Sequence, residues 1–287
     1  MKKIENYFRL IQFSHTIFAM PFALIGFYLG TIESQNSFSF YKFLLVILCM
    51  IFARSTAMAF NRYLDKNFDA KNLRTAIREI PAGIIKAKSV LFFTIANSLL
   101  FLICTFFINK LCFFLAPIAL FVVLGYSFTK RFTSFCHLIL GLGLSLAPIG
   151  SYLAVTGKFN LLPLLFSISV LFWVSGFDIV YALQDEAFDK ENKLYSIPVL
   201  LGRKNAINVS KLFHLLSSAA LVVAGIVGSF GWFFWIGFCV FVAMLIFQHS
   251  VIKRNGLKEI NLAFMTANGV ASIVFSIFVL ADLFFHF

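Results

Sequence analysis

Long stretches of apolar residues without any charged side chain set the strongest constraint on how this chain can fold. Ser89–Ile108 and Leu262–Leu280 are two of them, and each approaches the roughly 20 residues that cross a bilayer as an α-helix. Of the 287 residues, 61% are hydrophobic and 13% are charged, and that charged share is about half that of a typical soluble domain. We therefore expect an all-α integral membrane protein.

Nine apolar stretches have the length of a membrane-spanning helix. We expect transmembrane helices near residues 11–32, 40–62, 89–109, 111–128, 132–156, 161–184, 207–229, 231–250 and 261–285. The first stretch is too long for a signal peptide and lacks a clear cleavage site. Residues 1–287 are expected to form a single transmembrane domain.

The 24 lysine and arginine residues are unevenly distributed between the two ends of these helices. If the N-terminus is cytoplasmic, nineteen fall on the cytoplasmic side, whereas Lys42, Lys110 and Lys158 fall outside. Arg54 and Arg62 lie within the second helix. Because cytoplasmic loops are enriched in Lys and Arg, the pattern predicts an N-in, C-out topology. The same excess of Lys and Arg in the cytoplasmic loops explains the net charge of +12, so we expect no nucleic-acid partner.

The acidic residues gather in two windows at the predicted cytoplasmic ends of helices. Eight of the twelve are Asp65, Asp69, Glu79, Asp178, Asp185, Glu186, Asp189 and Glu191. Charged residues beside membrane helices are costly and mark functional sites. Both windows adjoin the long polar loops 63–88 and 185–206, so the predicted chemistry is on the cytoplasmic side.

The spacing within each window places its polar residues on one helix face. Asn61, Asp65 and Asp69 recur at i, i+4 and i+8, continuing the second predicted helix. The second window has the pattern Asp178-x-x-Tyr181-x-x-x-Asp185-x-x-x-Asp189, which continues the sixth. Solvated helix ends would explain one such window, but two windows with matched spacing favour a site.

Carboxylates one helical turn apart repel each other unless a cation lies between them. Mg²⁺ prefers oxygen ligands and bridges carboxylates to substrate phosphates, so we expect the two windows to hold Mg²⁺ and a diphosphate. The expected metal ligands are Asp65, Asp69, Asp178, Asp185 and Asp189. The cations that would neutralise a departing diphosphate are Arg74, Arg78, Lys130, Arg131 and Lys193.

Three further residues are candidates for contact with substrate. Arg54 lies seven residues before Asn61, so it shares that helix face two turns deeper in the membrane. A buried arginine in a membrane helix needs an anionic partner. Either a nearby Asp or a carboxylate on the substrate satisfies this need. Tyr126 and Tyr181 lie near the two windows and are candidates for a catalytic role.

These motifs resemble those of the UbiA family of intramembrane prenyltransferases. The family patterns N-x-x-x-D-x-x-x-D and D-x-x-Y-x-x-x-D-x-x-x-D are matched by Asn61/Asp65/Asp69 and Asp178/Tyr181/Asp185/Asp189. The loops match too, with Arg74, Thr75, Arg78, Pro81 and Gly83 after the first motif and Ser196–Pro198 after the second. Tyr126 followed by Lys130 and Arg131 also fits. The resemblance spans essentially the whole chain.

The resemblance implies nine transmembrane helices around a central cavity and Mg²⁺-dependent transfer of a polyprenyl group from its diphosphate. The catalytic residues it implies are Asp65, Asp69, Asp185, Asp189, Tyr126 and Tyr181. The substrate-binding residues are expected to be Asn61, Arg74, Arg78, Lys130, Arg131, Lys193 and Arg54. We expect a multi-pass protein of the inner, cytoplasmic membrane whose active site faces the cytoplasm.

The resemblance implies 4-hydroxybenzoate as the acceptor of the polyprenyl group, with a naphthoate as the alternative. Arg62 stands where many family members have Asp, and with Phe13–Phe22 it resembles a bacterial subgroup acting in quinone biosynthesis. Its members are often labelled 4-hydroxybenzoate polyprenyltransferases, whereas some are assigned to 1,4-dihydroxy-6-naphthoate in the futalosine route to menaquinone. A membrane ion or metabolite transporter is the alternative of another class. Transporters, however, place polar sites near the bilayer midplane, unlike these helix-end carboxylates.

Overall fold

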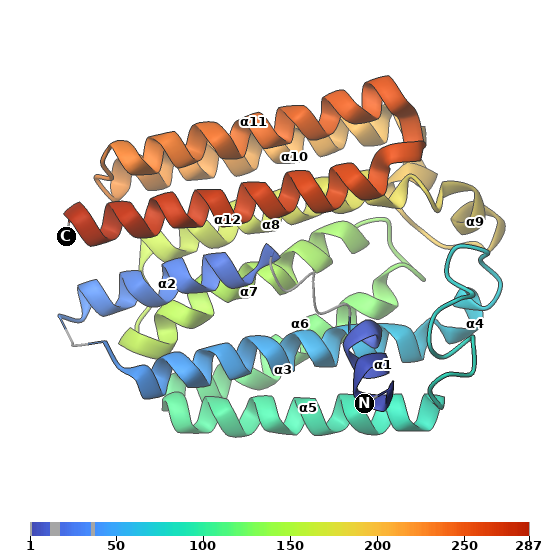
Figure 1. Cartoon of the computed structure of the whole chain (residues 1–287), viewed down its shortest axis with the longest axis horizontal. Coiled ribbons are helices and arrows are strands. Elements are labelled where there is room, and N and C mark those ends of the chain that lie inside the picture. Colours follow the sequence, from blue (N-terminus) through green and yellow to red (C-terminus); the bar gives the residue numbers. More distant parts are fainter. Residues whose placement is uncertain (1, 12–17, 36–37, 287) are drawn as a thin grey trace. The chain divides into compact units, whose positions relative to one another are not determined.

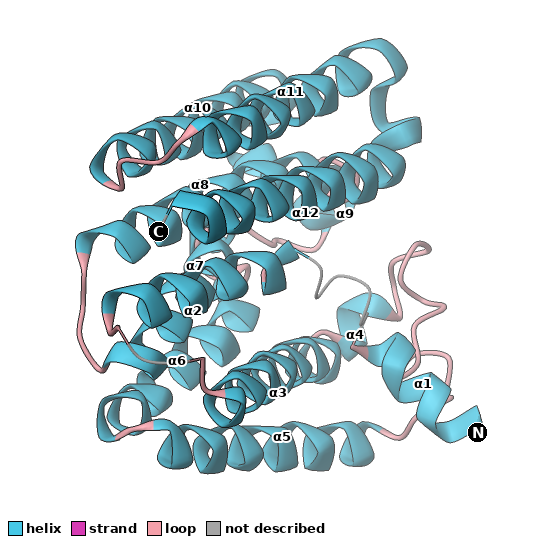
Figure 2. Cartoon of the chain, turned by 60° about the vertical axis from the view of Figure 1, so that its left-hand side comes forward, coloured by secondary structure: helices cyan, strands magenta, loops and turns pink. Residues whose placement is uncertain are grey.

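The computed structural model describes residues 2–11, 18–35 and 38–286. All the regular elements among these residues are helices, joined by loops and turns (Figure 2). The chain forms two compact units, which are described separately below. Unit 1 comprises Met1–Thr16 and Phe40–Thr129, and unit 2 comprises Ile17–Ser39 and Lys130–Phe287.

Ten longer helices and three short ones follow one another along the described residues (Figure 1). The longer helices are α1 (Lys2–Leu10), α2 (Met20–Glu33), α3 (Phe40–Leu64), α5 (Ala87–Ile108), α6 (Lys110–Thr129), α7 (Cys136–Thr156), α8 (Leu161–Ala182), α10 (Ile197–Val227), α11 (Trp232–Asn255) and α12 (Ile260–His286). The short ones are α4 (Lys66–Asp69), α9 (Glu186–Glu191) and the 3₁₀-helix η2 (Gly256–Glu259).

Each of the nine apolar stretches expected from the sequence contains a helix, although most bounds differ by a few residues and the stretch expected from residue 132 becomes helical only at Cys136. Eight helices in the described residues are long and apolar enough to span a membrane, and α2 is a shorter apolar helix. The all-α membrane architecture is therefore confirmed. Part of the first expected helix, residues 12–17, lies outside the described residues, as does the same part of the Phe13–Phe22 motif. The N-in, C-out topology and the central cavity stay predictions.

Helix α10 begins ten residues before the boundary expected at residue 207. Ser196 caps it, because the Ser196 hydroxyl accepts a hydrogen bond of 3.3 Å from the amide of Val199. Within the helix, Gly202 has φ 73° and ψ 164°, a backbone conformation that glycine tolerates best. Arg203 and Lys204 follow this kink and interrupt the apolar pattern. The residues before position 207 therefore do not resemble a membrane-spanning stretch.

In unit 1, helix α3 packs against both α5 and α6. Leu10 of α1, Ala59 of α3, and Ile85 and Val90 around the start of α5 form a buried apolar cluster. This cluster lies at the end of α3 that carries the first acidic window. Burial of such side chains contributes roughly 25 cal/mol per Å² of apolar surface removed from water, and it fixes the end of α3 on its neighbours.

In unit 2, helix α8 packs against α7 and α10, while α12 packs against α11 and α2. Figures 1 and 2 both show α10 and α11 side by side. Trp173 of α8 is fully buried and makes ring contacts with Phe22 of α2 and Phe241 of α11. Its indole N–H donates to Asn268 Oδ1 of α12 at 3.1 Å. Four helices are thus joined around one side chain.

Small residues allow close approach between the helices of unit 2. A Cβ atom on Gly26 of α2 would lie 2.0 Å from the carbonyl oxygen of Pro148 of α7. A Cβ atom on Gly141 of α7 would lie 2.4 Å from the carbonyl oxygen of Leu171 of α8. Any side chain at these positions would force the backbones apart, so glycine is required for this packing. Such interfaces are typical of membrane helices.

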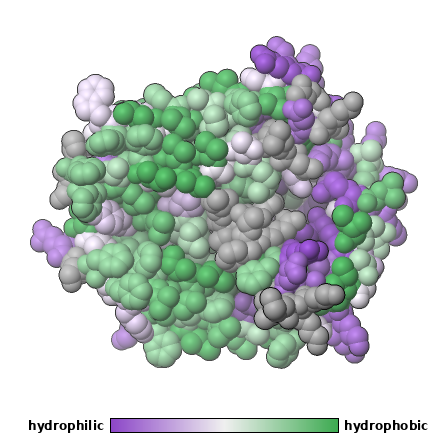
Figure 3. Space-filling model, viewed as in Figure 1, coloured by the Kyte–Doolittle hydropathy of each residue, from purple (hydrophilic) through white to green (hydrophobic). Residues whose placement is uncertain are grey.

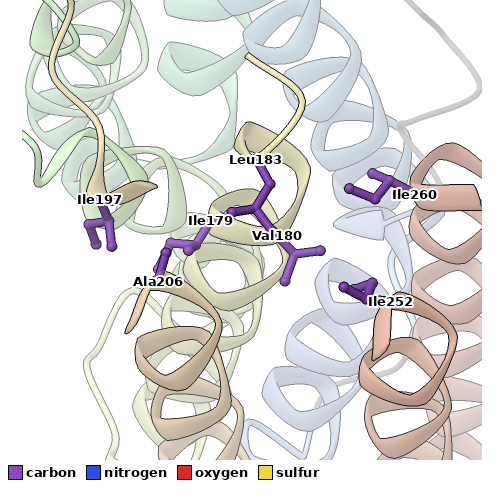
Figure 4. Packing of buried hydrophobic residues seen from close by; sticks show 7 residues of the cluster. All are labelled: Ile179, Val180, Leu183, Ile197, Ala206, Ile252 and Ile260. Carbon is purple, nitrogen blue, oxygen red and sulfur yellow. The ribbon is translucent and has the colours of Figure 1, made fainter. Parts of the chain in front are cut away.

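The end of α8 is held by a buried apolar cluster that extends over four helices. Figure 4 shows Val180 pointing toward Ile252 of α11 and Ile260 of α12, while Ile179 lies beside Ala206 of α10. Leu183 and Ile197 complete the cluster. Ile179, Val180 and Leu183 lie between Asp178 and Asp185 in the sequence. Their packing therefore fixes the end of the helix that carries Asp178.

The exposed surface over the long helices is largely apolar, as the face drawn in Figure 3 shows. Phe92 of α5 and Phe121 of α6 are 74% and 77% exposed. Large exposed apolar patches mark contact surfaces rather than surfaces that face water. On helices of membrane-spanning length they are the surface that faces lipid.

Asp282, near the end of α12, is fully buried and caps a neighbouring helix. Its Oδ2 accepts from the amide of Gly231 at 2.7 Å and its Oδ1 from that of Phe234 at 3.4 Å. Both amides lie at the start of α11, where backbone N–H groups have no partner within the helix. The carboxylate also complements the positive end of the helix dipole.

We therefore expect Asp282→Ala to lower the free energy of unfolding by about 1–3 kcal/mol, because two buried amides lose their acceptor. Asp282→Asn keeps one acceptor oxygen and should fall between this variant and the wild type. Thermal unfolding of the purified protein in detergent measures the difference. The matched control is Glu5→Ala, whose exposed pair with Arg9 at 2.9 Å should contribute little. An unchanged melting temperature for Asp282→Ala would contradict this role.

Candidate active site

The first acidic window begins in the last turn of α3 and continues into the short helix α4. Helix α3 ends at Leu64 and α4 starts at Lys66, with Asp65 between them at φ −90° and ψ 6°. The amide of Asp65 still donates to the carbonyl of Asn61 at 2.9 Å, and that of Asp69 to the carbonyl of Asp65 at 2.7 Å. The predicted one-turn spacing is therefore kept. In addition, Asn61 Nδ2 donates to Asp65 Oδ2 at 3.0 Å.

Asp69 is buried and bonded to a cation from the following loop. Arg78 donates to Asp69 Oδ1 at 2.6 Å, and the hydroxyl of Thr75 donates to the Asp69 carbonyl at 3.2 Å. Asp69 Oδ2 is buried, and no described residue gives it a hydrogen bond. The structure thus brings together Asp69 and Arg78, two residues predicted to serve the site, and it leaves one carboxylate oxygen for a further ligand.

Arg54 lies deeper along α3, and its surroundings in unit 1 contain no paired carboxylate. Its Nε is buried without a hydrogen-bond partner, and no described residue forms a salt bridge with it. It interacts electrostatically with Tyr126 of α6, as Asp65 also does. Tyr126 therefore lies within electrostatic range of Arg54 and Asp65. A pairing of Arg54 with a motif Asp of its own unit is not observed.

The second acidic window differs from the single helix face expected for it. Helix α8 carries Asp178 and Tyr181 but ends at Ala182. The amides of Leu183 and Asp185 then bond to carbonyls three residues back, at 3.2 and 3.0 Å, which is a tighter turn than an α-helix makes. Helix α9 follows, and the amide of Asp189 donates to the Asp185 carbonyl at 2.8 Å. Asp185 and Asp189 thus keep their spacing, but no single helix extends from Asp178 to Asp189.

Asp189 is 1% exposed and forms an ion pair of 2.8 Å with Lys130, which precedes α7. Burial raises the pKa of the Asp189 carboxyl above its ordinary value, and the Lys130 ammonium only partly offsets this. Burial alone would lower the pKa of Lys130, but the Asp189 carboxylate outweighs it and raises that pKa. Lys130 is therefore cationic at neutral pH and stabilises the ionised form of Asp189.

The remaining predicted residues occupy the surroundings of these pairs. The Tyr181 ring lies 4.7 Å from that of Phe264, and Asp185 interacts electrostatically with Lys130. Lys193 is exposed and has a left-handed backbone, with φ 55°. Arg74 donates its amide to Asn72 Oδ1 at 3.0 Å. Arg131 directly follows Lys130 in the turn between α6 and α7.

The structure places beside the second window one residue, His137, that no sequence pattern predicts. The His137 ring lies 2.7 Å from Asp178 through Nδ1 and is 2% exposed. It follows Cys136 at the start of α7, 41 residues before its partner, and it belongs to no acidic or metal-ligand pattern. Only the three-dimensional packing of α7 on α8 brings the two side chains together.

The donor set fits Mg²⁺ that is completed by a substrate. The candidate ligands are carboxylate oxygens, which Mg²⁺ prefers, and a buried Asp69 oxygen lacks a partner. Among the described residues, no three His, Cys, Asp or Glu side chains form a metal-binding group by themselves. Mg²⁺ is commonly held by one or two carboxylates together with substrate phosphates. Asp65 and Asp69, or Asp185 and Asp189, would provide such a pair.

The fold and these motifs define a class: a multi-pass helical membrane protein with basic and acidic side chains bonded together at the ends of its spans. Comparison with known proteins gives the family. The model of the UbiA prenyltransferase family matches residues 19–270, a segment that runs through both units. The chain belongs to this family and is a prenyltransferase.

Curated relatives and solved structures agree with this assignment. The 4-hydroxybenzoate octaprenyltransferase of Francisella tularensis subsp. mediasiatica is 29% identical over 80% of this chain and 81% of its own length. That of Nitrosomonas europaea is 30% identical, with 83% and 81% covered. A UbiA homolog from Aeropyrum pernix K1 has a TM-score of 0.83 at 26% identity, with 93% of this chain and 98% of that chain covered. A UbiA homolog from Archaeoglobus fulgidus bound to DMAPP and Mg²⁺ shares the fold, with a TM-score of 0.75, 20% identity, and 97% and 99% covered.

Proposed function

We propose that this protein transfers a polyprenyl group from a polyprenyl diphosphate to 4-hydroxybenzoate, with Mg²⁺ as cofactor, in quinone biosynthesis. The observation that carries the proposal is the bonding of each acidic window to a basic side chain, Asp69 to Arg78 and Asp189 to Lys130. Such alternation of charge suits a metal-bound diphosphate. The relatives named 4-hydroxybenzoate octaprenyltransferase support the acceptor. The homolog that binds DMAPP and Mg²⁺ supports the donor and the metal.

In the proposed reaction, the bond between the allylic carbon and the diphosphate oxygen breaks, and a bond to a ring carbon ortho to the phenol forms. The ring proton leaves to an Asp or to the released diphosphate. Mg²⁺, when bound, would stabilise the negative charge on the leaving group. Arg78, Arg74, Lys130, Arg131 and Lys193 would bind diphosphate oxygens, and charge-assisted hydrogen bonds of this kind are strong. Tyr126 and Tyr181 would lie near the reacting atoms.

Arg54 is assigned to the carboxylate of the acceptor. A guanidinium on a membrane helix is costly unless an anion pairs with it, and no described residue provides that anion. A planar guanidinium binds a carboxylate through two parallel hydrogen bonds. 1,4-Dihydroxy-6-naphthoate also has a carboxylate, so Arg54 alone does not separate the two acceptors. Arg62, which departs from the common family pattern, keeps the naphthoate as the second candidate.

We further propose that residues 1–287 act as one transmembrane domain. The family match across both units supports this. The uneven distribution of Lys and Arg supports an inner-membrane location with the site on the cytoplasmic side.

The direct test is an assay of the purified protein with Mg²⁺, a polyprenyl diphosphate and either acceptor. We expect prenylated 4-hydroxybenzoate as the product. Excess EDTA should abolish turnover and Mg²⁺ should restore it, whereas Zn²⁺ should do so poorly, because the site offers oxygen rather than Cys or His ligands. Product formation by mass spectrometry is the measurement. Product from the naphthoate alone would replace the acceptor, and full activity in EDTA would refute the metal.

Asp65→Asn and Asp189→Asn should each reduce turnover to near the background rate. Each substitution removes a charge proposed to bind the metal and keeps the size of the side chain. The control is Asp282→Asn, a buried carboxylate that caps a helix, which should change stability but not the Mg²⁺ requirement. Turnover and melting temperature are measured together. Near-normal turnover in either motif variant would remove that residue from the proposed site.

Arg54→Ala should raise the KM for the aromatic acid far more than that for the polyprenyl diphosphate. Arg54→Lys keeps the positive charge but loses the two parallel hydrogen bonds that a guanidinium makes to a carboxylate. This variant should fold, but it should bind the acceptor more weakly than the wild type. Steady-state kinetics with each substrate varied in turn provide the measurement. Arg9→Ala, an exposed arginine that already has a carboxylate partner, is the matched control. An unchanged acceptor KM in Arg54→Ala would leave Arg54 with a purely structural role.

A further inference from the structure

His137 makes two hydrogen bonds that join it to two other helices of unit 2. Its Nδ1 lies 2.7 Å from Asp178 Oδ2 on α8, and its Nε2 lies 3.3 Å from the amide nitrogen of Ile197, the first residue of α10. The ring is 2% exposed, whereas the Asp178 side chain is 25% exposed. One buried imidazole thus links a motif carboxylate to the start of another helix.

These partners fix the protonation of the ring. The Ile197 amide can only donate, so Nε2 must offer a lone pair and carry no proton. The donated proton is therefore on Nδ1, and Asp178 Oδ2 accepts it. Among the described residues, Asp178 Oδ1 has no hydrogen-bond or ion-pair partner. The carboxylate is held by one oxygen and can use the other.

The backbone around His137 is also fixed. Ser175 of α8 donates its hydroxyl to the His137 carbonyl at 3.1 Å. The thiol of Cys136 lies 3.7 Å from the carbonyl oxygen of Tyr195, and the amide of Tyr195 donates to the carbonyl of Lys130 at 2.7 Å. The imidazole therefore cannot swing away from Asp178 without breaking contacts on both sides.

Asp178 is bonded to an imidazole, whereas Asp69 is bonded to a guanidinium and Asp189 to an ammonium. The His137 ring holds one oxygen of Asp178 and thereby fixes the orientation of the carboxylate. Partners that orient metal ligands in this way affect metal affinity strongly, typically by about 10–100-fold.

We propose that His137 is the positioning residue for Asp178: its Nδ1–H holds Oδ2 so that Oδ1 is presented to the Mg²⁺–diphosphate. The inference rests on the proposed function. It assigns His137 no contact with substrate or reacting atoms. It predicts that the donor at the Nδ1 position, and not the imidazole as such, sets the affinity for Mg²⁺–diphosphate.

Two amide substitutions separate the two hydrogen bonds of the ring. The Nδ2 of Asn occupies nearly the position of Nδ1, so His137→Asn keeps the donor to Asp178 and loses the acceptor for Ile197. The longer His137→Gln places its amide near Nε2, so it keeps the acceptor for Ile197 and loses the donor to Asp178. The probe is the full-length protein in detergent, titrated with MgCl₂ at a fixed concentration of inorganic pyrophosphate.

The measurement is the rise in melting temperature that bound ligand causes, since a ligand that binds the folded state stabilises it. The Mg²⁺ concentration for the half-maximal rise should stay close to the wild-type value in His137→Asn and increase about tenfold in His137→Gln. The same difference should appear in the Mg²⁺ dependence of turnover. As control, His249→Asn breaks a buried hydrogen bond of 2.9 Å to His214 and should lower the melting temperature without moving the midpoint.

The outcomes distinguish this inference from the function on which it rests. If the wild-type protein shows no Mg²⁺–pyrophosphate shift, the proposed function fails and the inference with it. If the wild type shifts but His137→Gln has the same midpoint, or both variants lose affinity equally, only the positioning role is overturned. If His137→Gln does not fold, His137→Asn decides: a wild-type midpoint supports the role, and a tenfold increase refutes it.

Discussion

A carboxylate removed from water beside apolar helices needs a partner, and this constraint organises the polar part of the molecule. An uncompensated buried charge is very costly. The chain meets the need in four ways, with a guanidinium for Asp69, an ammonium for Asp189, an imidazole for Asp178 and backbone amides for Asp282. The partners of Asp189, Asp178 and Asp282 come from segments more than 40 residues away in the sequence, whereas Arg78 lies nine residues after Asp69. These carboxylates therefore also determine how loops and helices are held.

The kind of partner decides which carboxylates can act on a ligand. Both oxygens of Asp282 accept from amides of α11, so nothing remains for a metal and its role is structural. Asp69 and Asp178 each keep one oxygen without a partner among the described residues. Within unit 2, Asp282 is therefore structural, whereas Asp178 keeps an oxygen that can bind a ligand. Composition and spacing do not carry that distinction.

The helices and the acidic windows were predictable because they depend on local properties of the sequence. Apolar length alone defines a membrane helix, and one-turn spacing survives in Asp65–Asp69 and Asp185–Asp189 because their backbone hydrogen bonds are local. The tight turn after Ala182 and the kink at Gly202 were missed because hydrophobicity does not report backbone dihedrals. His137 was missed because its partners, Asp178 and Ile197, are 41 and 60 residues away, so its role exists only once α7 packs against α8 and α10.

The same constraint, applied to arginine, separates Arg54 from Arg62. Arg62 is 4% exposed, and it interacts electrostatically with the carboxylates of Asp69 and Glu79 of its own unit as well as with the guanidinium of Arg78. Among the described residues, Arg54 interacts electrostatically with the hydroxyl of Tyr126, and a phenol is a weak substitute for an anion. A guanidinium kept two helical turns inside a span without a carboxylate costs stability in the empty protein. Under the proposed function, binding of the acceptor carboxylate would offset that cost.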